Sequence, residues 1–111
     1  MKKLPSHAVI VVFTTVPKRS IAIRLSRVIV KKKISACATV LPGVRSFYHW
    51  ERKMVEDKEV LIIFKTTMRR YPAVEKTIKA LHPYEVPEIL AVQIKNGYSP
   101  YLAWVSKEVG N

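Results

Sequence analysis

The chain has 111 residues, of which 49% are hydrophobic and 25% charged, and only 3 are glycine. These values exclude a disordered or fibrous chain, and we expect residues 1–111 to form a single domain around one core. The 20 Lys and Arg residues outnumber the 8 Asp and Glu residues and give a formal net charge of +12.

Cysteine usage and hydropathy predict the compartment. Cys37 is the one cysteine, so the chain has no intrachain disulfide and no cysteine-rich zinc finger. The apolar run at residues 8–13 is too short for a secretory signal, and no stretch approaches the roughly 18 apolar residues that span a bilayer. We therefore expect a soluble, cytoplasmic protein without a membrane span.

The first half of the chain predicts a strand, a helix and a long extended segment. The helix has apolar residues at helical spacing, Ser20 as its expected N-cap and three lysines in its last turn. The extended segment contains a Pro-Gly pair, which indicates a bend or bulge. These elements are expected at residues 8–15, 20–33 and 34–50, with the bend at 42–43.

The second half predicts a charged hairpin tip, an apolar strand, an amphipathic helix that keeps Pro72 in its first turn, a fourth strand and a short final helix. They are expected at residues 51–57, 58–67, 69–81, 89–94 and 100–109.

This order of elements predicts an α+β, ferredoxin-like βαββαβ sandwich with a long hairpin and a C-terminal helix. Two helices cover one face of the sheet, so the other apolar face needs a different cover. The hairpin strands are longer than usual and leave edges exposed. We therefore expect a closed homo-oligomer.

Residues 82–89 form a rigid polar connection between the second helix and the fourth strand. Two prolines fix the backbone there and hold an imidazole, a phenol and a carboxylate close together. Such connections are also common in stable domains without a site. His82 therefore has two open interpretations, a ligand or a hydrogen-bonded cap of the helix.

The positive charge is concentrated in the first half, where no acidic residue precedes Glu51. On the predicted helix, Arg24, Arg27 and Lys31 share one face and offer a positive strip to polyanions. The segment contains no aromatic residue, whereas single-strand and RNA readers interleave stacking rings. We interpret the strip as a solvated face and expect no nucleic acid partner.

Several segments together resemble the CutA family of divalent cation tolerance proteins, over about residues 9–105. They are CATVLPGV at 37–44, SFYHW at 46–50, KTT at 65–67, HPYEVPEI at 82–89 and YLAW at 101–104. The resemblance implies a ferredoxin-like subunit in a tight homotrimer, an association with copper and other metal ions, and no accepted catalytic reaction. The fold and trimer also look like those of PII signalling proteins, which bind small ligands between subunits.

The resemblance carries over to seven candidate site residues. Cys37, His82 and Glu85 are expected as sulfur, nitrogen and oxygen ligands of Cu(II) or another divalent cation, with no other cofactor required. The alternative function is binding of a small anion in a cleft between subunits. The residues expected in that cleft are Lys65, Tyr84, Tyr48 and Trp50.

Other interpretations of these residues stay open, and the sequence departs from the family pattern. Cys37 also suits a small core residue, and the aromatic residues Tyr48, Trp50 and Trp104 also suit an oligomer interface. Thr14 and Leu81 replace a cysteine and a histidine of some family members, and Arg52 replaces a frequent hairpin glycine. Cys37 and His82 are the one available nucleophile and base, and nothing in their spacing orients them, so we expect no enzyme.

Overall fold

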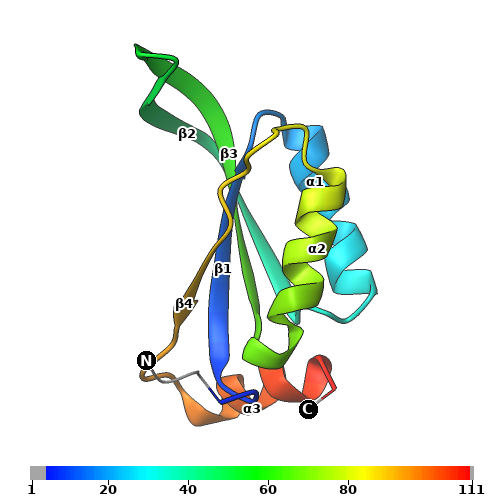
Figure 1. The fold of residues 1–111 in the computed structure, drawn as a ribbon. Helices are drawn as coiled ribbons and strands as arrows, with labels where there is room; N and C mark the ends of the chain where they lie inside the picture. The colour runs from blue at the N-terminus through cyan, green and yellow to red at the C-terminus, as the bar shows by residue number, and fades with distance from the viewer. Residues whose placement is uncertain (1–4, 111) are drawn as a thin grey trace.

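The computed structural model describes residues 5–110, which form a four-stranded sheet with two long helices against one face (Figure 1). The strands follow the order β2-β3-β1-β4, and each neighbouring pair is antiparallel. No helix within residues 5–110 is long and apolar enough to cross a membrane. The elements are β1 (Val9–Val16), α1 (Arg19–Lys31), β2 (Cys37–Trp50), β3 (Lys53–Thr67), the 3-10 helix η1 (Met68–Arg70), α2 (Tyr71–Leu81), β4 (Leu90–Gln93) and α3 (Ser99–Glu108).

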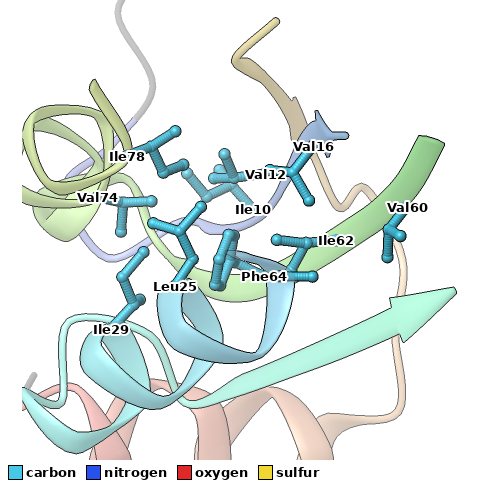
Figure 2. Close-up of a cluster of buried hydrophobic side chains, with 11 residues drawn as sticks. Ile10, Val12, Val16, Leu25, Ile29, Val60, Ile62, Phe64, Val74 and Ile78 are labelled. Carbon is cyan, nitrogen blue, oxygen red and sulfur yellow. The ribbon is translucent and has the colours of Figure 1, made fainter. Parts of the chain in front are cut away.

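The core lies between the sheet and the pair α1 and α2. Alternate residues of β1 and β3 point to this side and are fully buried, as the period of two in a strand requires. Figure 2 shows the cluster, which includes Ile10, Val12 and Val16 from β1, Val60, Ile62 and Phe64 from β3, Leu25 and Ile29 from α1, and Val74 and Ile78 from α2.

The helices α1 and α2 leave the opposite face of the sheet uncovered, while α3 lies at the end of the sheet where β1 begins (Figure 1). On β4, which pairs with β1 at one edge, the apolar side chains of Leu90 and Val92 are 56% and 49% exposed. By register they lie opposite Phe13 and Val11 on the helix-free face. The second face is therefore an apolar surface available for association.

The β2–β3 hairpin extends beyond the rest of the sheet (Figure 1). A bulge shifts the register between Leu41 and Val44, as expected from the Pro-Gly pair, and Gly43 has a φ of +78°. The expected tip at 51–57 is wrong, because β3 already begins at Lys53. Only Glu51 and Arg52 make the turn, with φ of +50° and +67°, the left-handed pair of a two-residue hairpin. The prediction of a tip at 51–57 relied on the charge of these residues, but residues 53–57 belong to β3.

The ends of α1 also differ from the expectation. Lys18 is the N-cap, with extended backbone and no side-chain cap bond, so Ser20 lies inside the first turn. The helix ends at Lys31, Lys32 is the C-cap, and Lys33 follows with a φ of +58°. Only one of the three lysines therefore lies in the last turn. In α2, Pro72 falls in the first turn as expected.

Candidate functional site

A groove of about 720 Å³ lies between the protruding part of the hairpin and the connection from α2 to β4. The hairpin supplies aromatic and acidic side chains, and the connection supplies the rigid segment with two prolines. The lining residues are Thr15, Ser46, Phe47, Tyr48, Trp50, Glu59, Pro83, Tyr84, Glu85, Val86 and Glu88.

His82 fixes the connection to the sheet at the edge of this groove. It ends α2 with extended backbone, because the following Pro83 disfavours helical geometry at that residue. The residue is buried, with an exposed fraction of 8%. Nδ1 accepts a hydrogen bond from the backbone N–H of Tyr84 at 3.1 Å, so Nε2 carries the proton and donates to the carbonyl of Thr15 at 2.7 Å. Both ring nitrogens are therefore engaged.

Two phenols bind two carboxylates along the groove. The hydroxyl of Tyr84 donates to Glu59 Oε2 at 2.8 Å, and the hydroxyl of Tyr48 donates to Asp57. Burial, and then the hydrogen bond and charge of Glu59, raise the pKa of Tyr84 well above its usual value. The hydrogen bond with Asp57 raises the pKa of Tyr48. Both phenols therefore stay protonated donors at neutral pH.

Glu59 is the most unusual group in the groove. It is only 5% exposed, and among the described residues its carboxylate accepts one side-chain hydrogen bond, from Tyr84. Within residues 5–110 the one salt bridge joins Arg45 to Glu56 at 2.9 Å, so Glu59 has no cationic partner there. A buried carboxylate without a cation is costly, because its desolvation is only partly offset. This arrangement favours binding of a cation.

Cys37 and Lys65 lie together at a different part of the sheet. They are paired across β2 and β3, and Lys65 Nζ lies 3.8 Å from Cys37 Sγ and donates to Thr39 Oγ1 at 2.7 Å. Burial first, and then the nearby thiol, raise the pKa of Tyr101 on α3. Thr15, which accepts the hydrogen bond from His82, pairs with Leu61 on β3. Leu61 and Lys65 are four residues apart on that strand, so their backbones are about 13 Å apart.

The structure thus divides the candidate residues into two groups. Tyr48, Trp50, Tyr84 and Glu85 line the groove, with His82 at its edge, whereas Cys37 and Lys65 do not line it. In the described part of one chain, no three His, Cys, Asp or Glu side chains are close enough to hold a metal ion. A single subunit therefore does not assemble Cys37, His82 and Glu85 into one site.

Sequence reasoning missed Asp57 and Glu59. Asp57 was placed in the charged hairpin tip, and Glu59 was placed in the strand at 58–67 without any role. A signal was present, because Glu59 occupies the same face of the strand as the apolar Leu61 and Ile63. An acidic residue that shares a strand face with apolar residues, here the helix-free face, indicates a partner or a site.

Comparisons with known proteins agree with one another. The family model described as "CutA1 divalent ion tolerance protein" matches residues 10–108. The divalent-cation tolerance protein CutA of Thermus thermophilus is 40% identical over 100 residues, which cover 90% of this chain and 97% of that protein. The human protein CutA is 39% identical over 93 residues, or 84% of this chain and 52% of that protein.

Solved structures match equally well. The Cut A1 structure from Thermus thermophilus has a TM-score of 0.89 and 39% identity, with 92% of this chain and 99% of that chain covered. Relatives are described for different compartments, since the Arabidopsis thaliana protein is called chloroplastic and the Archaeoglobus fulgidus protein periplasmic.

Proposed function

The chain belongs to the CutA1 divalent ion tolerance protein family, and from that premise we propose that it binds divalent cations in the acidic groove. The observation that carries the proposal is Glu59, a buried carboxylate without a cationic partner in the described residues. Asp57, Glu85 and Glu88 lie beside or along the same groove. The chain as a whole has a net charge of +12, whereas the groove is lined by acidic side chains.

Carboxylate oxygens suit hard divalent ions, which bind through one or two protein carboxylates and keep several waters. Glu59 and Glu85 are the proposed ligands for such an ion. The phenol of Tyr84 orients the Glu59 carboxylate through its hydrogen bond and leaves the second oxygen of that group free to bind.

Copper favours nitrogen and sulfur ligands, and here the proposal takes a second form. A copper site that uses His82, Glu85 and Cys37 needs donors from two subunits, because one subunit keeps Cys37 outside the groove. It also requires His82 to give up its bond to Thr15 or to Tyr84. Neither Thr14 nor Leu81 replaces the missing soft ligands.

The proposed assembly is a homotrimer of ferredoxin-like subunits, each a single domain spanning residues 1–111. The helix-free sheet face, the exposed Leu90 and Val92 at one edge, and the extended hairpin support this assembly, because each exposes apolar surface that a partner would bury. We propose the cytoplasm as its compartment, on the basis of the unpaired Cys37.

We propose binding rather than catalysis as the mode of action. The one nucleophile and base pair that the sequence offers, Cys37 and His82, is separated in the fold, and His82 is fully engaged by hydrogen bonds. A second candidate function is binding of a small anion beside Lys65, whose ammonium bonds only to Thr39 and Cys37 among the described residues. Tyr48, Trp50 and Tyr84 would join such a cleft only from another subunit.

The test is calorimetric titration of the metal-free protein with Mn²⁺, Zn²⁺ and Cu²⁺, after light scattering has measured its mass. We expect saturable binding that Glu59→Gln and Glu85→Gln weaken. Glu75→Gln is the matched control, because Glu75 also accepts a phenol hydrogen bond, from Tyr71 at 2.7 Å, but lies on α2 outside the groove. Binding that all three variants leave unchanged contradicts the proposed site.

A further inference from the structure

The helix layer carries a positive charge that the proposed function does not use. Ten basic side chains on α1, on α2 and at their ends are exposed, and the one acidic residue within these helices is Glu75. Tyr71 donates a hydrogen bond to that carboxylate. The basic residues are Lys18, Arg19, Arg24, Arg27, Lys31, Lys32, Lys33, Arg69, Lys76 and Lys79.

None of these ten cations is neutralised by an ion pair in the described residues. The one salt bridge there is between Arg45 and Glu56 on the hairpin. The acidic groove lies at the hairpin and the 82–89 connection, whereas α1 and α2 lie side by side over one sheet face (Figure 1). The hairpin mixes both signs of charge, whereas the exposed charges of the helix layer are almost all positive, which makes this layer suited to a polyanion.

The spacing of the charges favours a regular polyphosphate. Arg24, Arg27 and Lys31 are all exposed and stand opposite the buried side of α1 formed by Leu25 and Ile29. At 1.5 Å per residue the strip is about 10 Å long. A nucleic acid duplex carries one phosphate per about 1.7 Å of its axis when both strands are counted, so about six phosphates surround that length of duplex and those on the near side face the strip. The strip has enough anionic partners for all three side chains.

The surrounding side chains decide between polyanions. A single strand needs exposed rings for stacking, but the exposed aromatic residues of the described chain lie on the hairpin or in residues 98–104. Insertion into a membrane surface needs exposed apolar side chains, and on α1 and α2 the one large hydrophobic side chain exposed is Val30, at 36%. Contacts to the phosphates of a duplex require neither feature.

We propose that the α1–α2 surface binds the phosphate backbone of double-stranded nucleic acid, DNA or RNA, without sequence preference. This inference takes the alternative to the expected solvated strip, and the experiment below decides between the two. The absence of aromatic residues argues against single strands and leaves duplex binding open. The inference is independent of the proposed cation site, which lies on different elements.

The test is fluorescence anisotropy of a labelled duplex with the full-length protein, over a salt series from about 50 to 200 mM. In the triple variant Arg24→Gln/Arg27→Gln/Lys31→Gln, the slope of log affinity against log salt falls in magnitude by about 2.7, because each lost phosphate contact removes about 0.9. Over the fourfold salt range, these three contacts make the wild-type affinity fall about 40-fold more than the affinity of the triple variant. Glutamine keeps a helix propensity near that of Arg and Lys, so the fold is retained.

The matched control Arg52→Gln/Lys53→Gln/Lys58→Gln removes the same charge from the exposed hairpin and leaves the slope unchanged. Equal losses in the two triple variants overturn the proposal, because they show a response to net charge alone. Absence of duplex binding at about 50 mM salt also overturns it. Tighter binding to a single strand, or displacement of the duplex by anionic phospholipid vesicles, assigns the surface to another partner and overturns it too.

Discussion

Replacing the buried carboxylate of Glu59 by an amide tests the groove most informatively. In the wild type, Tyr84 donates to Glu59 Oε2 at 2.8 Å. Glu59→Gln keeps the size of the side chain and an oxygen that accepts this hydrogen bond. The charged bond contributes about 1.5–3 kcal/mol and a neutral one about 0.5–1.5 kcal/mol. Desolvation of a carboxylate that is 5% exposed and lacks a cation costs several kcal/mol. We expect the variant to be more stable than the metal-free protein by about 1–2 kcal/mol.

The assay is urea denaturation at a fixed protomer concentration, because the stability of an oligomer depends on concentration. Added Mn²⁺ stabilises the wild type more than it stabilises Glu59→Gln, because the variant keeps only the Glu85 carboxylate as a proposed ligand. The control Glu75→Gln on α2, whose bond to Tyr71 is also a phenol–carboxylate bond, loses up to about 1 kcal/mol and keeps the response of the wild type. If metal-free Glu59→Gln is destabilised by more than the control, the charge of Glu59 is already compensated in the fold and the groove has no unmet need for a cation.

His82→Ala destabilises the fold by about 2–4 kcal/mol, because the carbonyl of Thr15 and the N–H of Tyr84 lose their partner. Thermal or urea unfolding measures this loss, and a loss below about 0.5 kcal/mol contradicts a capping role. Arg52→Gly raises stability by about 1 kcal/mol, as glycine adopts the φ of +67° without strain, and an unchanged unfolding midpoint argues against this. Burial and the Glu75 bond raise the pKa of Tyr71 to about 12, above its unfolded value near 10. Its stabilising contribution is therefore complete below pH 10 and lost between about pH 10 and 12, and Tyr71→Phe makes unfolding less sensitive to pH in that window; equal sensitivity disproves the assignment.

Local patterns in the sequence were sufficient to predict the elements. Period-two burial of β1 and the helical spacing of α1 and α2 gave the right types in the right order. The hairpin tip was mispredicted because Lys53, Glu56 and Asp57 are charged although they lie on a strand that pairs with β2. Ser20 was mispredicted as a cap because α1 begins earlier, at Arg19. Backbone hydrogen bonds determined these ends, through the β2–β3 ladder at the tip and the bond from the Ala22 N–H to the Lys18 carbonyl at the start of α1, and composition does not encode them directly.

The candidate site was predictable only where its residues are neighbours in sequence. Tyr84 and Glu85 follow His82 directly, so their proximity was foreseeable. Glu59 reaches Tyr84 across 25 positions, and that contact depends on how the connection crosses the sheet. The separation of Cys37 from His82 was also not predictable, because it follows from the β2–β3 and β1–β3 registers. Long-range register decides which polar groups share a site.

Anomalous diffraction from crystals of the protein loaded with Mn²⁺ or Cu²⁺ tests the cation site most directly, because it locates the bound ion. We expect a peak between the hairpin and the 82–89 connection, within bonding distance of the Glu59 or Glu85 carboxylate. A peak beside Cys37 and Lys65, or no peak in the groove at saturating metal, rules out the proposed cation site.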